Sequence, residues 1–143
     1  MRRHHRWLTA LPLMAVLVLS ACGKPPEEGH EIDEPYSLEE VGGTDLAQVT
    51  LTDSAAERLG IETAPIVEEG DLTVVPSAAV MVDSDGVYWV YTNPEPLVFL
   101  RHEITIEREE GATTFVSAGP PVGTLVVTVG VPELYGAETE IGH

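Results

Sequence analysis

The sequence has a single cysteine, Cys22, among its 143 residues. One thiol cannot close a disulfide within the chain or build a cysteine-cluster metal site. Basic residues are also scarce: seven Lys and Arg stand against 24 Asp and Glu, so the formal net charge is −17. Because a nucleic-acid-binding protein needs a basic surface for the phosphate backbone, we expect no nucleic-acid partner. Hydrophobic residues make up 43% of the chain, which is too many for a wholly disordered protein.

Residues 1–21 have the organisation of a secretory signal. Three arginines precede a mostly apolar run over residues 8–19. A run of about a dozen residues is too short for a permanent membrane-spanning helix. The stretch Leu19-Ser20-Ala21-Cys22 then places two small residues before a thiol that can be acylated, and it resembles the lipobox of bacterial lipoproteins. An ordinary secretory signal with an incidental cysteine is the alternative.

The lipobox resemblance implies cleavage before Cys22 and anchoring in membrane lipid through palmitate-type acyl chains on that cysteine. Cleavage removes three arginines, which leaves four basic residues against 24 acidic ones and a net charge of −20. Several acyl chains hold a protein stably, whereas one chain alone binds marginally. The acidic body would be repelled by anionic headgroups. We therefore expect a lipid-anchored protein on the extracytoplasmic face of the cell membrane, either periplasmic or at the cell surface.

Residues 22–46 contain three prolines and many acidic residues, with few apolar ones. Like charges repel and proline prevents regular strand pairing, so this segment is predicted to be a disordered, flexible acidic leash. The alternative is a cation-binding tail built on Glu28, His30, Glu31 and Asp33. The conformational entropy lost on ordering such a tail argues against tight binding.

Residues 47–143 are predicted to form an all-β domain, a small antiparallel or barrel-like sheet with one short helix. Apolar residues alternate with polar ones over residues 98–107, which places His102 on the apolar face. Val90 and Val127 lie in runs typical of central strands. The short helix is expected over residues 52–60, with Thr52 or Ser54 as its cap and Gly60 as its terminator. One further helical turn is expected over residues 131–136.

The sequence offers no reaction centre that we can identify, so we expect no enzyme, no metal and no cofactor. The stretch Asp83-Ser84-Asp85-Gly86 lacks the remaining ligands of a calcium loop and is interpreted as a hairpin turn. His102 has no second histidine or cysteine near it in the sequence. No serine stands in a nucleophile-elbow pattern, and no glycine-rich turn leads into a helix of the length that cradles phosphate.

Two stretches, residues 49–66 and residues 75–80, resemble the periplasmic adaptor subunits of efflux pumps, the membrane fusion protein family. Residues 88–91, 101–106 and 119–136 continue the resemblance in the same order. Full adaptors are several times longer and carry a β-barrel domain, a lipoyl-like domain and usually an α-helical hairpin between the first two stretches. Here a short connection replaces them, so the resemblance implies the membrane-proximal domain alone.

The adaptor family uses this domain to contact an inner-membrane pump. The resemblance therefore implies a non-enzymatic, adaptor-like accessory subunit of a membrane transporter or efflux system, with the transporter as its protein partner. Full adaptors assemble into rings, so a homo-oligomer stays open. The candidate contact residues are Arg101, Glu103, Leu134 and Tyr135, although packing onto the sheet is the favoured role for Leu134. The alternative function is a sensor or chaperone lipoprotein that binds a ligand or metal through the leash with His30 or His102.

Overall fold

The structure, a computed structural model, describes residues 34–140. The predicted signal, Cys22 and most of the predicted leash lie outside these residues. The described helices are α1 (Asp53–Leu59), the short 3-10 helix η1 (Ser77–Ala79) and α2 (Val131–Thr139), and none of them has the length and apolarity needed to cross a membrane. The strands are β1 (Tyr36–Glu40), β2 (Ala47–Leu51), β3 (Glu62–Pro65), β4 (Val67–Glu69), β5 (Leu72–Pro76), β6 (Met81–Val82), β7 (Tyr88–Glu95), β8 (Val98–Glu110), β9 (Thr113–Ala118) and β10 (Leu125–Val129).

The strands form one curled antiparallel sheet, so the predicted all-β class is confirmed. Its main order is β3-β10-β7-β8-β9-β5-β4, while β1 pairs with β2 and β2 with β8. The two ends of this order, β3 and β4, are consecutive in the chain and are separated only by Ile66. The Ile66 N–H donates to the Thr124 carbonyl at 2.8 Å, and the Gly123 N–H donates to the Ile66 carbonyl at 2.8 Å. The backbone thereby holds the sheet in a half-barrel.

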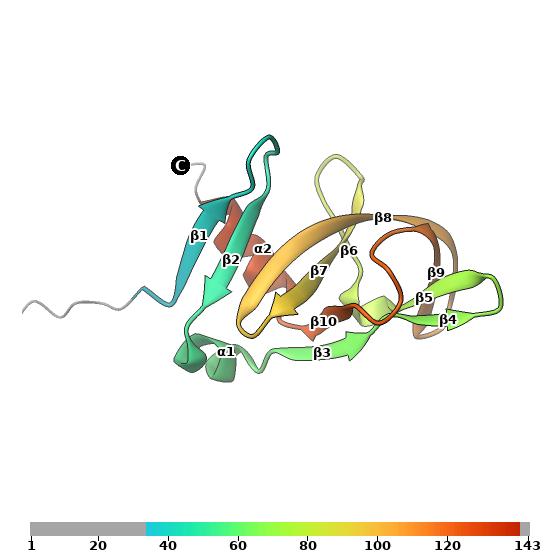
Figure 1. Cartoon of the computed structure of the whole chain (residues 1–143), viewed down its shortest axis with the longest axis horizontal. Helices are drawn as coiled ribbons and strands as arrows, with labels where there is room; N and C mark the ends of the chain where they lie inside the picture. The colour runs from blue at the N-terminus through green and yellow to red at the C-terminus, as the bar shows by residue number, and fades with distance from the viewer. Residues whose placement is uncertain (1–33, 141–143) are drawn as a thin grey trace, which may run out of the picture. The chain divides into compact units, whose positions relative to one another are not determined.

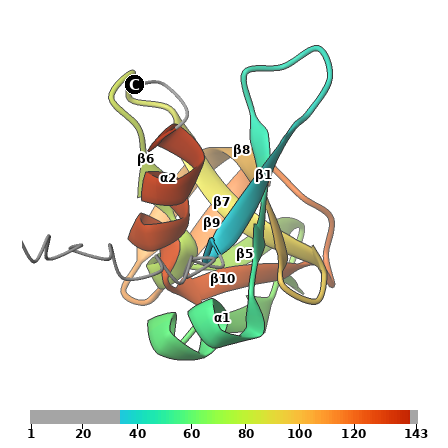
Figure 2. The same ribbon diagram turned by 90° about the vertical axis from the view of Figure 1, so that its left-hand side faces the viewer.

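The sheet separates two apolar clusters. The inner cluster fills the concave side and consists of Ile66, Val75, Ala79, Val90, Ile104, Val116 and Val126. The outer cluster lies between the sheet, the helices and the β1–β2 hairpin, and consists of Val49, Leu51, Ala55, Tyr91, Phe99, Val127, Val131, Leu134 and Ala137. The β1–β2 hairpin and α2 occupy one end of the domain, opposite β4, β5 and β9 (Figure 1). From that end, α2, α1 and β1 stand in front of the sheet (Figure 2).

Helix α1 has the ends that the sequence predicts. The Thr52 hydroxyl accepts a hydrogen bond from the Ala55 N–H at 3.2 Å, so Thr52, and not Ser54, is the cap. Gly60 is left-handed, with φ of 62°, and its N–H bonds back to the last turn. The predicted final helical turn is also present, but α2 continues three residues further, to Thr139.

The prediction of a flexible leash through residue 46 is wrong for its last part. Residues 36–40 form β1, which pairs with β2 from Tyr36 opposite Leu51 to Glu40 opposite Ala47. Tyr36 and Leu38 alternate with acidic and polar residues and pack against the outer cluster. Alternation at period two outweighs the acidic composition here, because one face of the strand can be buried. The folded domain therefore includes residues 36–40 and does not begin at residue 47.

The prediction of one mostly buried face along residues 98–107 is correct for Ile104 and Ile106, which pack in or against the inner cluster, but wrong for His102. Phe99 is buried in the outer cluster, whereas Ile104 is buried in the inner cluster, on the opposite face of β8. His102 is exposed. The reason is that β8, with 13 residues, passes from the outer layer into the curled part of the sheet and serves a different cluster at each end. Val90 and Val127 are fully buried in central strands, as predicted.

Candidate functional site

The structure brings two of the predicted contact residues together and separates the other two. The side chain of Arg101 is only 11% exposed and lies beside Glu138 of α2. Tyr135 is half-buried next to Arg101, and its ring centroid is 5.5 Å from the guanidinium carbon. Leu134 is completely buried in the outer cluster, which excludes it as a partner contact and confirms its packing role. Glu103 is exposed on β8.

Three side chains, Tyr91, Arg101 and Glu138, form a buried polar group that we call the Glu138 cluster. The Glu138 side chain is 3% exposed, and its carboxylate accepts hydrogen bonds from the Tyr91 hydroxyl and from the Ala47 N–H at 3.2 Å. Arg101 Nε lies 3.2 Å from Glu138 Oε2, within ion-pair distance but outside hydrogen-bond geometry. Burial, together with the bond to Glu138, raises the pKa of the Tyr91 phenol above its ordinary value. The cluster ties α2 to β2, β7 and β8.

A second set of contacts supports Arg101 from its other side. The guanidinium carbon lies 4.4 Å from the centroid of the Trp89 ring, a cation–π arrangement. The Trp89 indole N–H donates to Asp83 Oδ2 at 2.7 Å. Asp83 Oδ1 also accepts from the backbone of Asp85 and Val87, and the Val87 bond leads the causes that lower the pKa of this carboxyl. Both carboxylate oxygens of Asp83 are thus engaged within the turn, by two backbone N–H groups and by the Trp89 indole, which agrees with the interpretation as a hairpin turn.

The cavity beside the Glu138 cluster is polar. It has a volume of about 440 Å³, and Arg101, Glu138 and Asp45 are among the residues that line it. Across residues 34–140, no group of three or more His, Cys, Asp or Glu side chains is placed to hold a metal ion. The alternative cation-binding tail at Glu28, His30, Glu31 and Asp33 lies outside the described residues.

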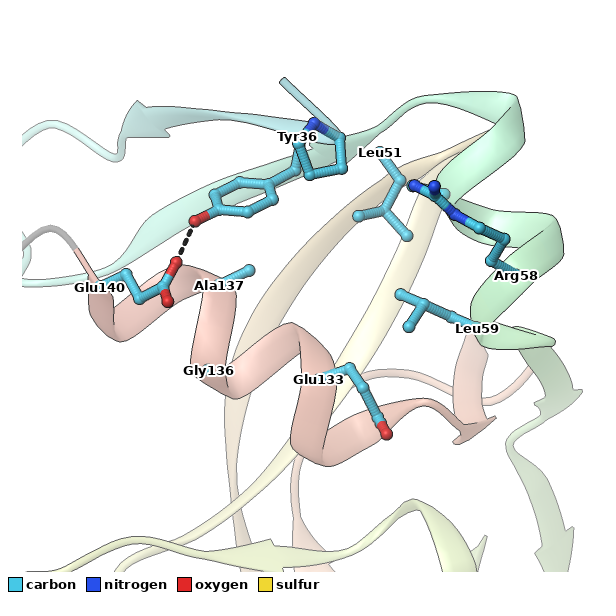
Figure 3. A pocket seen from close by; sticks show the side chains of 10 residues that line it. Tyr36, Leu51, Arg58, Leu59, Glu133, Gly136, Ala137 and Glu140 are labelled. Atoms are coloured by element: carbon cyan, nitrogen blue, oxygen red, sulfur yellow. Dashed lines mark hydrogen bonds between the residues drawn. The ribbon is translucent and has the colours of Figure 1, made fainter. Parts of the chain in front are cut away.

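An apolar groove between α1 and α2 is the candidate site that the sequence did not indicate. Its volume is about 380 Å³, within the range of about 300–1,000 Å³ typical of small-molecule sites. Its apolar walls come from Leu51, Ala55, Leu59 and Ala137. Figure 3 shows Leu51 and Leu59 facing the turn of α2 that carries Ala137. The space between the two helices stays open because the residues that face it include Ala55, Gly136 and Ala137, whose side chains are too small to fill it.

The entry of the chain into the domain forms part of this groove. Pro35 and Tyr36 line it, next to the last described turn of α2. The Tyr36 hydroxyl donates a hydrogen bond to Glu140, which raises the pKa of the Tyr36 phenol (Figure 3). Arg58 and Glu133 supply the other charges at the groove, one of each sign. The groove therefore combines apolar walls with a rim that is acidic overall.

Sequence reasoning missed the groove because its walls come from segments far apart in the chain. The α1 helix and the first turn of α2 are recognisable from local sequence, whereas β1 is not, and no local pattern shows that the three segments face one another. No family model, no curated protein and no solved structure matches this chain. Functional assignment therefore depends on the sequence signals and on the geometry described above.

Proposed function

We propose that this protein is a lipid-anchored, extracytoplasmic and non-enzymatic accessory subunit of a membrane transporter, similar in role to the membrane-proximal domain of efflux-pump adaptors. The observation that carries the proposal is Leu19-Ser20-Ala21-Cys22 after an arginine-rich start and an apolar run. The resemblance of residues 47–137 to adaptor subunits, in the order of their matching stretches, is the reason for proposing a transporter as the partner.

The short sequence separation between Cys22 and β1 supports a role close to the membrane surface. Only 12 residues, 23–34, separate Cys22 from Pro35. A segment of that length spans at most about 40 Å when fully extended. An acyl anchor on Cys22 would therefore keep the domain near the bilayer, where the exposed loops of a transporter lie.

The buried ionisable groups support a binding role more than a catalytic one. The carboxylate of Glu138 already accepts hydrogen bonds from Tyr91 and Ala47 and faces Arg101. A general base needs a carboxylate within reach of a substrate proton, and this carboxylate is 3% exposed and engaged within the fold. Its contacts hold α2 in place, which is a structural task.

The anchoring part of the proposal is tested with Cys22→Ser in intact cells supplied with labelled palmitate. The label should enter the wild-type chain and a Ser84→Ala control, whose substitution lies in the exposed turn after β6, but not the Cys22→Ser chain. The Cys22→Ser protein should leave the membrane fraction or stay at precursor size. A mature-sized, membrane-bound Cys22→Ser protein would show that the lipobox interpretation is wrong.

The partner is tested by crosslinking from surface positions in intact cells. A photoreactive group at Glu103 or Tyr135 should capture one dominant polytopic membrane protein. Glu103→Lys should reduce that yield without changing the melting temperature, because Glu103 is exposed. Arg101 is unsuitable for charge reversal, since it is buried beside Glu138. Capture of many abundant membrane proteins, unaffected by Glu103→Lys, would refute the adaptor-like role.

A further inference from the structure

The apolar lining of the groove favours an aliphatic ligand. The walls are built from the side chains of Leu51, Ala55, Leu59 and Ala137, and Gly136 contributes no side chain. A Cβ atom added at Gly136 would meet no atom within 4 Å apart from its chain neighbours and the backbone of its own helix, so the space in front of it is open. Closing such a groove over methylene groups removes apolar surface from water on both partners, which is favourable by about 0.8 kcal/mol per buried methylene.

The groove lies where the predicted acyl anchor can reach it. Pro35 lines the groove, and Cys22 is only 13 positions before it. A group on Cys22 is therefore confined to within about 40 Å of the groove. The sequence predicts a flexible leash here, and a short flexible linker gives an effective concentration on the order of millimolar, which would favour binding within one molecule.

The charge of the domain distinguishes between possible sources of an acyl chain. Residues 34–140 carry 20 acidic residues against three arginines, a net charge of −17. The carboxylate of a free fatty acid and the headgroup of an anionic lipid would both be repelled by this field. An acyl chain joined to Cys22 or its amino group carries no charge of its own, so the same field does not oppose it.

We propose that the groove between α1 and α2 binds one acyl chain carried on Cys22 of the same molecule when that chain is not inserted in a bilayer. This inference rests on the proposed acylation of Cys22. Its consequence is that the domain shields part of its own anchor from water whenever the anchor leaves a bilayer, and releases it when a bilayer again offers a larger apolar volume.

The test uses the chain from Cys22 to His143, in which Cys22 is the only thiol. Cys22 is alkylated with either N-butylmaleimide or N-hexadecylmaleimide in detergent-free buffer. The hexadecyl protein should stay monomeric, melt at least about 4 °C above the butyl protein, and show shifted methyl resonances for Leu51, Ala55 and Leu59. Vesicles of phosphatidylcholine should return those resonances to the butyl positions.

The matched variants are Gly136→Leu and Gly136→Ala. Gly136→Leu fills the groove and should abolish the difference between hexadecyl and butyl proteins, while Gly136→Ala should retain it. Equal melting points and methyl shifts for the two alkyl lengths would overturn the inference, as would a hexadecyl effect that persists in Gly136→Leu. Free hexadecanoate added to the butyl protein should shift the methyl resonances much less. An equal shift would assign the groove to fatty acids in general and overturn the assignment to Cys22.

The outcomes separate this inference from the proposed function. Palmitate labelling of Cys22 in cells, together with an unresponsive groove, overturns only the inference. A Cys22 that is never acylated in cells removes the occupant and overturns both, whatever the alkylated protein does.

Discussion

The two apolar clusters of this domain lie on opposite faces of the same strands, but they are enclosed in different ways. In β7, Val90 enters the inner cluster and Tyr91 the outer one; in β10, Val126 and Val127 divide in the same manner. The inner cluster is entirely aliphatic and is enclosed by the curled sheet and η1. The outer cluster contains aromatic rings and borders the buried Glu138 cluster.

The outer face depends on segments from both ends of the folded chain. The β1 strand reaches α2 through the Tyr36–Glu140 hydrogen bond, and β2 reaches it through the Ala47–Glu138 bond. The inner face is closed mainly by strand pairing, and one side-chain hydrogen bond, between the hydroxyls of Ser77 and Thr114 at 2.8 Å, joins η1 to β9. The inner face is therefore built from consecutive and neighbouring strands, whereas the outer face combines the sheet with helices and a hairpin from distant parts of the chain and carries the groove.

The largest effect should follow from Val90→Asp, which puts an unpaired carboxylate in the inner cluster. Burying such a charge costs several kcal/mol, comparable to the total stability of about 5–15 kcal/mol of a domain. We expect loss of the folded state, measured by circular dichroism and amide exchange. Val82→Asp is the control, because Val82 is 54% exposed and the change should stay within about 0.5 kcal/mol. A folded Val90→Asp protein would contradict the placement of Val90 in a closed apolar core.

The next effect concerns the Glu138 cluster. Glu138→Ala leaves the Arg101 guanidinium buried without its carboxylate and should destabilise the protein by about 3–5 kcal/mol, measured by urea unfolding. The double change Glu138→Leu with Arg101→Met should recover most of this loss, because neither charge then remains buried. If the double variant is as unstable as Glu138→Ala, the hydrogen bonds of Glu138 to Tyr91 and Ala47, and not only its charge, hold α2 in place.

A smaller effect is expected from the pH dependence of Tyr91. Its pKa in the folded protein is raised above the ordinary 10.0, so the folded state holds the phenol proton more tightly than the unfolded state. The free energy of unfolding should thus be unaffected by this group below pH 10 and fall as the pH rises above it. Tyr91→Phe should flatten that decline in alkaline urea titrations, whereas Tyr88→Phe, at an exposed position, should not.

The smallest effect should be a gain in the outer layer. Gly136→Ala adds a methyl group at a helical position where, apart from its chain neighbours and the backbone of its own helix, no atom lies within 4 Å of the new Cβ. Alanine is preferred over glycine in a helix by about 1 kcal/mol, so the free energy of unfolding should rise by that amount. A loss of stability in thermal unfolding would indicate that the groove closes around Gly136 in solution.

Much of the fold was predictable from local patterns in the sequence. The strand over residues 125–129, the hairpin turn at Asp83 and both ends of α1 were each expected from a few adjacent residues. Turn chemistry, helix caps and β-branched runs act over short distances, so they can be recognised without knowledge of the fold.

The errors arose where long-range contacts outweighed local composition. The β1 strand looked like part of an acidic linker, because its pairing with β2 and the docking of Tyr36 on α2 are not visible locally. Arg101 looked like a surface residue until α2 supplied Glu138 beside it. The face that His102 occupies depended on where β8 changes from one cluster to the other.

The acidic charge, the all-β class and the signal-like beginning that ends at Cys22 could be predicted from the sequence, because these depend on composition, periodicity and short motifs. Three features became apparent only in the folded molecule: which face of each strand is inner or outer, the shared burial of Tyr91, Arg101 and Glu138, and the groove between α1 and α2. The physical reason is that burial and cavities are properties of surfaces brought together from distant parts of the chain, and no single segment specifies the surface that it will meet.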